Sequence, residues 1–365
     1  MLTAGDDYPI HQTADPVAYS GTDRNFYDRY FFNGYDKDGD VFFACALGVY
    51  PNINVMDASF CVVANGQQYN LRGSRALNSE RMTTTVGPIT IEVVEPLQAL
   101  RIKVDSPEHG VSANLLFTAR TAPLEEPRFT RRNGPRTFMD YTRLTQNGLW
   151  KGEITVDGSS HTFAPETHWG TRDRSWGIRP VGVQDPQPQV PPIEPQFHWL
   201  WAPLNFDDCY TLFHINADGT GEPWNTNGVI APLAGEPQEF PTAAVEVDLM
   251  QGTRHAQAAR ITYPHGDGTE TTIDLTRKWD FSMSGLGYTH PEWGHGHYKG
   301  ELAVGFDSIN MDKDLNDMLN LHVQTFVSAT MTLPDGTTKR GSGVFEQLVI
   351  GAYEPWGLKG LIGPA

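Results

Sequence analysis

The sequence is poor in cysteine and in long apolar runs. Its 365 residues include only Cys45, Cys61 and Cys209, too few and too scattered for a disulfide framework. An odd number of cysteines fits a reducing compartment. No run approaches the roughly 18 apolar residues of a membrane-spanning helix, and residues 1–16 lack the apolar core of a signal peptide. These absences predict a cytoplasmic protein without a membrane span.

Positive charge is also scarce. The chain has 27 Lys and Arg residues against 44 Asp and Glu residues, which gives a formal net charge of −17. Such a surface repels phosphate backbones and anionic membranes, so nucleic acid is excluded as a partner. The sequence also lacks a Gly-rich phosphate loop, a dinucleotide fingerprint and a Gly-x-Ser-x-Gly elbow. Kinase, dehydrogenase and serine hydrolase functions are therefore excluded.

The residues that are present are typical of β structure. Glycine and proline number 36 and 26, and the apolar fraction of 39% suffices for a sizeable core. Aromatic and β-branched runs recur between turn signals such as Asp38-Gly39 and Asn65-Gly66. The length favours two domains. We predict an all-β protein with two consecutive, mainly antiparallel β domains of barrel or sandwich size.

One segment divides this pattern. Residues 181–195 contain five prolines and read as a linker. The predicted organisation is an extended lead-in over 1–25, a β domain over 26–180, a Pro-rich linker over 181–196 and a second β domain over 197–365. Within the first domain, the arginine-rich stretch 128–143 predicts a short helix or a solvated loop across the barrel mouth. Only residues 311–320 look helical in the second domain.

The most informative stretch is 168–179, His-Trp-Gly-Thr-Arg-Asp-Arg-Ser-Trp-Gly-Ile-Arg. Two glycines beside large rings indicate a backbone that turns sharply or passes close to another strand. Asp173 lies between Arg172 and Arg174. It is either a buried clamp in an ion pair with an arginine, with Trp176 stacked over it, or a proton-transferring acid in an aromatic pocket.

These residues carry a family resemblance. Trp169-Gly170, the run from Arg172 to Arg179, a linker and then the aromatic strand Phe-His-Trp-Leu-Trp-Ala-Pro-Leu at 197–204 resemble the carotenoid 1,2-hydratase (hydroxyneurosporene synthase) superfamily. That superfamily also holds AttH-like proteins and fungal lipocalin-like Diels–Alderases. The resemblance implies two lipocalin-like antiparallel β-barrels joined by a linker. It also implies hydration, cyclisation or rearrangement of hydrophobic, often isoprenoid or polyketide, substrates without a redox cofactor.

The match has one departure. The superfamily motif commonly has Asp-His where this chain has Asp173-Arg174, so a catalytic Asp-His pair cannot be carried over intact. Fold transfer is reasonable on this basis, whereas substrate transfer is not.

Tryptophans provide a second set of candidates. Trp199 and Trp201 are two residues apart on a predicted strand and face one side, with His198 on the other. Together with Trp169 and Trp176 they line an apolar cavity that stabilises a cationic intermediate, or they form ordinary barrel core.

The histidine-rich run 290–298 provides a third set. His295 and His297 are two residues apart and would share one strand face. Metal ligation, acid/base or substrate contact, and a structural role all remain open for them. Because no third ligand can be located, we predict no bound metal.

We hypothesise a cofactor-independent lyase or isomerase of hydratase, dehydratase or cyclase type, acting by acid/base chemistry on a hydrophobic small molecule of secondary metabolism. A non-catalytic carrier of a hydrophobic ligand is the alternative. A homodimer remains open. The predicted catalytic residues are Asp173, His297 and His198. The predicted substrate contacts are Trp169, Trp176, Trp199, Trp201, Tyr141, Tyr298, His295 and Arg179. No cofactor is predicted.

Overall fold

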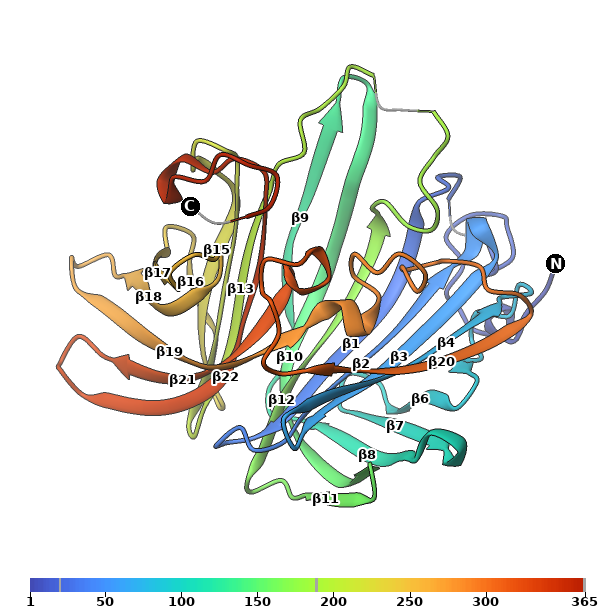
Figure 1. Cartoon of the computed structure of the whole chain (residues 1–365), viewed down its shortest axis with the longest axis horizontal. Helices are drawn as coiled ribbons and strands as arrows, with labels where there is room; N and C mark the ends of the chain where they lie inside the picture. The colour runs from blue at the N-terminus through green and yellow to red at the C-terminus, as the bar shows by residue number, and fades with distance from the viewer. Residues whose placement is uncertain (20, 188–189, 364–365) are drawn as a thin grey trace. The chain divides into compact units, whose positions relative to one another are not determined.

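The computed structural model describes residues 1–19, 21–187 and 190–363, and it consists almost entirely of antiparallel β-strands (Figure 1). The all-β prediction is confirmed. Helical structure in the described ranges is limited to short 3-10 turns: η1 (Ala4–Asp7), η2 (Pro51–Ile53), η3 (Pro107–His109), η4 (Met283–Leu286), η5 (Met318–Asn320) and η6 (Glu354–Trp356). The predicted helical segment 311–320 is thus reduced to η5. None of these helices has the length and apolar character needed to cross a membrane.

The first sheet has the order β20-β4-β3-β2-β1-β12-β10-β8-β7-β6-β5, and β9 and β11 also pair with β10. Val86 of β5 packs against Gly73 of β4, so the sheet curls back on itself. Its strands are β1 (Phe26–Asp36), β2 (Phe42–Tyr50), β3 (Val55–Ala64), β4 (Gln67–Ala76), β5 (Thr85–Val86), β6 (Ile89–Glu95), β7 (Ala99–Ser106), β8 (Val111–Ala119), β9 (Leu124–Asn133), β10 (Arg136–Val156), β11 (Ser159–Phe163), β12 (His168–Ile178) and β20 (Leu302–Asn310).

The second sheet has the order β16-β15-β14-β13-β22-β21-β19-β18-β17. It curves around a separate apolar core that includes Leu200, Phe213, Ile261 and Phe345. Its strands are β13 (Phe197–Phe206), β14 (Cys209–Ala217), β15 (Pro223–Pro232), β16 (Gln238–Phe240), β17 (Ala244–Leu249), β18 (Ala256–Pro264), β19 (Glu270–Ser282), β21 (Val323–Thr332) and β22 (Thr338–Ile350).

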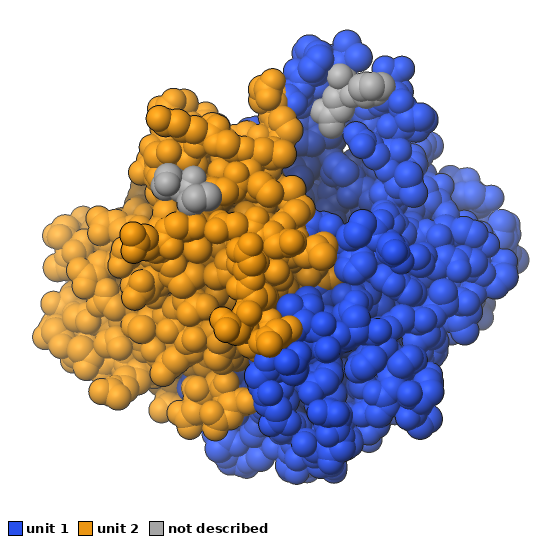
Figure 2. Space-filling model, viewed as in Figure 1, with its two compact units in different colours: residues 1–36, 41–193, 285–309 blue, residues 37–40, 194–284, 310–365 orange. Residues whose placement is uncertain are grey.

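The chain forms two compact units (Figure 2). Unit 1 contains residues 1–36, 41–193 and 285–309, and unit 2 contains residues 37–40, 194–284 and 310–365. The sequence-based ranges kept 285–309 with the C-terminal domain. In the structure β20 pairs with β4 instead, because the chain leaves unit 2 and supplies an edge strand to the first sheet. Local sequence patterns do not reveal such a return.

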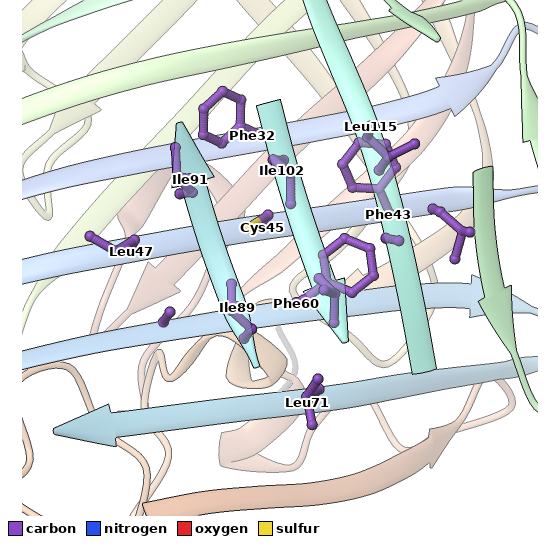
Figure 3. Packing of buried hydrophobic residues seen from close by; sticks show 14 of the residues in the cluster. Phe32, Phe43, Cys45, Leu47, Phe60, Leu71, Ile89, Ile91, Ile102 and Leu115 are labelled. Carbon is purple, nitrogen blue, oxygen red and sulfur yellow. The ribbon is translucent and has the colours of Figure 1, made fainter. Parts of the chain in front are cut away.

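Apolar side chains fill the concave side of the first sheet. Phe32, Phe43, Phe60, Leu115 and their neighbours pack there, none more than 7% exposed (Figure 3). Aromatic and branched side chains therefore form an ordinary core on this side of the first sheet. Side chains alternate between the two faces of a strand. The residues between these core positions therefore lie on the other face of the sheet, which we call the polar face.

The arginine-rich stretch 128–143 is neither helix nor loop. It forms most of a hairpin between β9 and β10, turning at Asn133-Gly134 (Figure 1). The Asn-Gly pair is itself a hairpin signal, but the prediction for this stretch relied on its arginine content instead.

The stretch 168–179 supplies β12, whose Gly177 passes close to β10. A Cβ there would lie 2.2 Å from the carbonyl oxygen of Asp140, and its φ is 138°. Close approach, rather than a sharp turn, explains that glycine.

Candidate active site

One row of residues crosses the polar face of the first sheet. Strand pairing aligns Asp57 of β3, Gly48 of β2, Arg29 of β1, Ser175 of β12 and Arg143 of β10. The row therefore places ionisable side chains from three strands on one surface of unit 1. Gly48 has no side chain, and the Tyr50 hydroxyl and Oδ1 of Asp57 occupy the position that a Cβ there would take.

Arg29 is the most buried cation of this row. Its side chain is 2% exposed, and its Nη1 donates to the hydroxyl of Tyr288 at 2.6 Å. The guanidinium centre lies 4.8 Å from the Tyr288 ring centroid. Its Nε and Nη2 atoms are buried and have no hydrogen-bond partner in the structure. A buried guanidinium with two unused donors is costly unless a ligand accepts from them, which marks Arg29 as a binding residue.

Asp57 is the acid of the row. Its Oδ1 accepts from the Tyr50 hydroxyl at 3.2 Å, and its Oδ2 accepts from the Gly296 N–H at 2.7 Å. Burial raises the pKa of Asp57 to about 6, although the Gly296 N–H, the Arg29 charge and the Tyr50 hydroxyl each act to lower it. A carboxyl group with this pKa exchanges protons readily near neutral pH.

Gly48 makes this geometry feasible. A Cβ at Gly48 would lie 2.2 Å from the Tyr50 hydroxyl and 2.9 Å from Oδ1 of Asp57. Any other residue would therefore displace the hydroxyl, the carboxylate or both.

An aromatic wall borders the row. The Arg179 guanidinium lies 4.4 Å from the Tyr27 ring centroid and 5.7 Å from that of Tyr288. The rings of Tyr27 and Tyr141 meet edge to face at 6.1 Å. Nη2 of Arg179 is buried without a partner in the structure. We call Tyr27, Arg29, Tyr50, Asp57, Tyr141, Arg179 and Tyr288 the arginine–tyrosine cluster.

The connection between η4 and β20 covers part of this cluster. The ring of His295 packs edge-on against Tyr288 at 4.4 Å, and its Nε2 bonds to the Leu286 carbonyl oxygen at 2.9 Å. The Gly182 N–H donates to the His295 carbonyl at 2.6 Å. His295 therefore positions Tyr288 and the Gly296 N–H that holds Asp57.

A small cavity lies on the other side of Asp57. Its volume is about 10 Å³, and its polar lining comes from Asp57, Ser59, Arg72, Ser74 and His297. Such a volume holds one water molecule, and the lining offers the two to four polar partners that a buried water needs. His297 therefore lies near Asp57, while its backbone carbonyl accepts from the Ser74 hydroxyl at 2.9 Å.

Replacing Tyr50 with Phe is expected to raise the pKa of Asp57 further, because the hydroxyl stabilises the ionised carboxylate. The midpoint of the Asp57 titration, followed by carboxyl NMR or a pH–rate profile, should move to higher pH. Tyr69→Phe is the matched control, since its hydroxyl donates to Asp157 at 2.9 Å on the surface of the same unit. A midpoint that stays in place or moves down in Tyr50→Phe would contradict this geometry.

Asp173 lies on the same polar face, opposite Phe31 of β1 and Thr145 of β10. Its neighbours Arg172 and Arg174 point to the other face, because adjacent residues of a strand alternate. Arg174 pairs there with Asp28, and Arg172 donates to Gln146 at 2.8 Å. The cation affected by Asp173 on the polar face is Arg143, whose pKa it helps to raise. The charge of Asp173 also acts to raise the pKa of Arg172 and of Arg174. A clamp in which Asp173 forms an ion pair with an arginine stays a prediction.

A comparison with protein families identifies the group. The model of a family of unknown function, DUF8625, matches residues 2–359. The chain belongs to the DUF8625 family. Curated proteins give no significant match.

Solved structures extend this result to the fold. This DUF8625 protein is similar to an AttH-like protein from Nitrosomonas europaea, with a TM-score of 0.54 and 13% identity over 93% of this chain and 98% of that one. It is also similar to CghA in complex with Sch210972, with a TM-score of 0.51 and 10% identity over 89% of each chain. These likenesses confirm the fold that the resemblance implied, two lipocalin-like β domains. The narrower likeness to carotenoid hydratases stays a prediction.

The remaining predicted contacts of unit 1 are scattered. Trp169 is buried on the polar face, where the Arg120 guanidinium lies 5.2 Å from its ring. Trp176 is 38% exposed and lies on the face opposite Asp173, so it does not stack over that carboxylate. Tyr298 is 61% exposed. Of the residues named from sequence, the structure brings Tyr141, Arg179, His295 and His297 around the new cluster.

Unit 2 has its own polar row. Trp199 and Trp201 share one face of β13, as the alternation predicted, and His198 lies on the other. Trp199 Nε1 donates to Glu346 at 3.1 Å, and Glu346 also bonds to His322 at 2.9 Å and Gln324 at 2.7 Å. Burial favours the neutral acid, but these partners lower the pKa of Glu346, so it remains a fully bonded carboxylate. This arrangement is typical of a structural network.

His198 lies in an aromatic setting. Its ring stacks on Tyr353 at 4.2 Å and meets Trp356 at 5.3 Å, and burial lowers its pKa to about 4. A histidine that stays neutral across the physiological range is poorly suited to donate protons.

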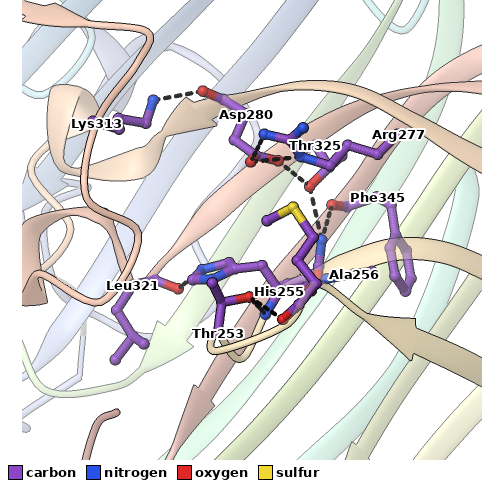
Figure 4. Close-up of polar contacts among 11 residues, drawn as sticks. Thr253, His255, Ala256, Arg277, Asp280, Lys313, Leu321, Thr325 and Phe345 are labelled. Carbon is purple, nitrogen blue, oxygen red and sulfur yellow. Dashed lines mark hydrogen bonds and ion pairs between the residues drawn. The ribbon is translucent and has the colours of Figure 1, made fainter. Parts of the chain in front are cut away.

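A second network in unit 2 surrounds Asp280 (Figure 4). Its carboxylate accepts from Arg277 at 2.8 Å and from Thr325 at 2.6 Å, and Lys313 donates to its backbone carbonyl. Every oxygen of Asp280 is thus engaged, which indicates a structural role. Across the described residues no group of three or more His, Cys, Asp or Glu side chains is placed to hold a metal ion.

Proposed function

We propose that the protein is a cofactor-independent lyase or isomerase that moves a proton on a hydrophobic small molecule, with Asp57 as the group that gives and takes the proton. The observation that carries the proposal is the Asp57 carboxyl group, with a pKa of about 6, in line with the buried cation Arg29. Convergence of an acid, two arginines and four tyrosines supports an enzyme over a carrier, which needs only an apolar surface.

Each group of the cluster has a role in this proposal. Protonated Asp57 donates to a carbon or oxygen of the substrate, and its carboxylate later takes a proton back. Arg29 binds an oxygen-bearing group of the substrate, and Arg179 stabilises negative charge that develops on a substrate oxygen, since their buried donors are fixed before the reaction. The aromatic rings of Tyr27 and Tyr141 contact the apolar body. The water-sized cavity beside Asp57 favours hydration or dehydration within this class.

The proposal is tested by proton exchange with solvent. The protein is incubated in deuterated water with a panel of hydrophobic alkenes, enones and hydroxy compounds, and products are followed by mass spectrometry. Enzyme-dependent gain of deuterium, or gain of oxygen from isotope-labelled water, is the expected result. The same incubation with the Asp57→Asn variant gives the background level of isotope incorporation. Exchange that is equal in the two proteins would refute the role of Asp57.

Asp173 is the rival proton donor on the same face. If Asp57 carries the proton, Asp173→Asn should change turnover by less than about tenfold, since Asp173 then contributes only its charge, which acts on nearby arginines such as Arg143. Initial rates on the substrate found by the exchange screen give the measurement. A loss of about a hundredfold or more in a normally folded Asp173→Asn protein would transfer the proton-donor role to Asp173.

A further inference from the structure

The unused donors of Arg29 form a particular pair. Nε and Nη2 lie on the same edge of a guanidinium group, and their N–H bonds point in parallel toward two acceptors. In Arg29 this edge is the buried and unpartnered one, whereas Nη1 is bound to Tyr288. The side chain is therefore held in place through Nη1, while the N–H groups of Nε and Nη2 remain available to a ligand with two acceptors.

The same edge binds carboxylates elsewhere in this chain. Arg128 donates through Nε and Nη2 to the two oxygens of Asp140, at 2.7 Å each. Arg260 donates through the same two atoms to Asp274, at 2.6 and 3.0 Å. In both cases one carboxylate satisfies the whole edge. Arg29 has the same geometry without a protein carboxylate opposite it.

We infer that Arg29 binds a carboxylate group of the ligand, so that the substrate is a hydrophobic carboxylic acid. This inference deepens the proposed function and rests on it for the identity of the site. A carboxylate supplies two coplanar acceptors at the spacing of the Nε–Nη2 edge, which a single carbonyl or hydroxyl oxygen does not. The aromatic wall of Tyr27 and Tyr141 fits the apolar remainder of such an acid.

Charge in the cluster agrees with an anionic ligand. Arg29 and Arg179 carry two positive charges, and Arg143 is already paired with Glu126 at 2.6 Å. The only acid held directly within the arginine–tyrosine cluster is Asp57, which is partly protonated near neutral pH. Binding a carboxylate next to Asp57 would favour its protonated form, so substrate binding would prepare the proton donor.

The test compares hydrophobic acids with their uncharged amides. Binding of naphthoate, cinnamate and decanoate to the wild-type protein is measured by calorimetry beside the three matched amides. A charge-assisted bidentate contact predicts that at least one acid binds about 10–100-fold more tightly than its amide. In Arg29→Met this preference should vanish, because the acids lose much more affinity than the amides. Arg29→Lys keeps the positive charge but loses the two parallel N–H donors, so the preference for the acid over the amide should fall to an intermediate value.

Arg260→Met is the matched control, since it removes an exposed arginine with the same fork and should leave the preference intact. The acid-to-amide ratio of the wild-type protein decides the question even if an Arg29 variant fails to fold. Equal binding of acids and amides, no binding of the acids, or tighter binding of naphthyl phosphate than of naphthoate would each overturn the inference. Because these ligands need no turnover, this failure is distinct from a failure of Asp57→Asn to lower the reaction rate.

Discussion

Asp57→Asn is expected to lower turnover by about 10²–10⁴-fold and to leave the fold intact, the usual contribution of a positioned proton-transfer group. Asparagine keeps the shape of the side chain: its amide oxygen can accept from the Gly296 N–H, while its NH₂ group can donate to the Tyr50 hydroxyl oxygen. It cannot transfer a proton. Rate constants on the substrate from the exchange screen, together with circular dichroism and thermal melting, provide the measurement.

The pH dependence separates this role from a structural one. Burial raises the pKa of Asp57 from 3.8 to about 6. As a proton donor Asp57 should support full activity below about pH 6, and activity should fall about tenfold per pH unit above it.

Stability depends on the same group. Because the pKa of Asp57 is raised in the folded state, its contribution to stability is fully present below about pH 4 and is lost as pH rises through about 6. Asp57→Asn should therefore be no less stable than the wild-type protein at pH 7.

Asp105→Asn, an exposed change on β7 of the same unit, is the matched control and should retain wild-type rates. A well-folded Asp57→Asn protein that keeps full turnover would refute the proposed mechanism. If the variant instead melts at a much lower temperature, Asp57 would be a structural residue, and its raised pKa would need another explanation.

The fold was largely predictable from local chemistry. Asp-Gly and Asn-Gly pairs between aromatic and β-branched runs marked the hairpins, because few other residues adopt the backbone of those turns. The return of residues 285–309 to the first sheet was not predictable. It depends on which sheet has an unpaired edge strand next to β20. The alternation of side chains within one segment predicts a strand but does not tell which strand it pairs with.

The site was only partly predictable. Tyr141, Arg179, His295 and His297 were named from the aromatic, arginine and histidine content around them. Arg29 and Asp57 were missed because their partnership depends on the register of β1, β2 and β3, which the sequence does not state. One signal was available for Asp57, which is the only charged residue of β3, a strand that is otherwise apolar apart from Ser59. An acid inside such a strand needs a partner or a function.

The second large effect is expected from Glu126→Gln, which should destabilise the folded protein by about 3–5 kcal/mol. Glu126 extends the Asp57–Arg29 row onto β9 and accepts from Arg143 Nε and the Thr145 hydroxyl, both at 2.6 Å. The two charged side chains are only 5% and 12% exposed. Burial alone would lower the pKa of Arg143, yet Glu126 raises it, so removing the carboxylate leaves a buried cation without its main partner. Chemical denaturation and melting temperature provide the measurement.

Glu125→Gln is the matched control, because Glu125 is the exposed neighbour on the same strand and its loss should change stability by no more than about 0.5 kcal/mol. Equal melting of the two variants would show that Glu126 is not the main counter-charge of Arg143. Asp173 is then the remaining carboxylate candidate, since it also raises the pKa of Arg143.

The double variant Glu126→Gln with Asp173→Asn tests whether the two carboxylates act together. Its loss in free energy of unfolding should exceed the sum of the two single losses, because each carboxylate partly compensates for the loss of the other. Strict additivity would mean that neither carboxylate compensates for the loss of the other at Arg143.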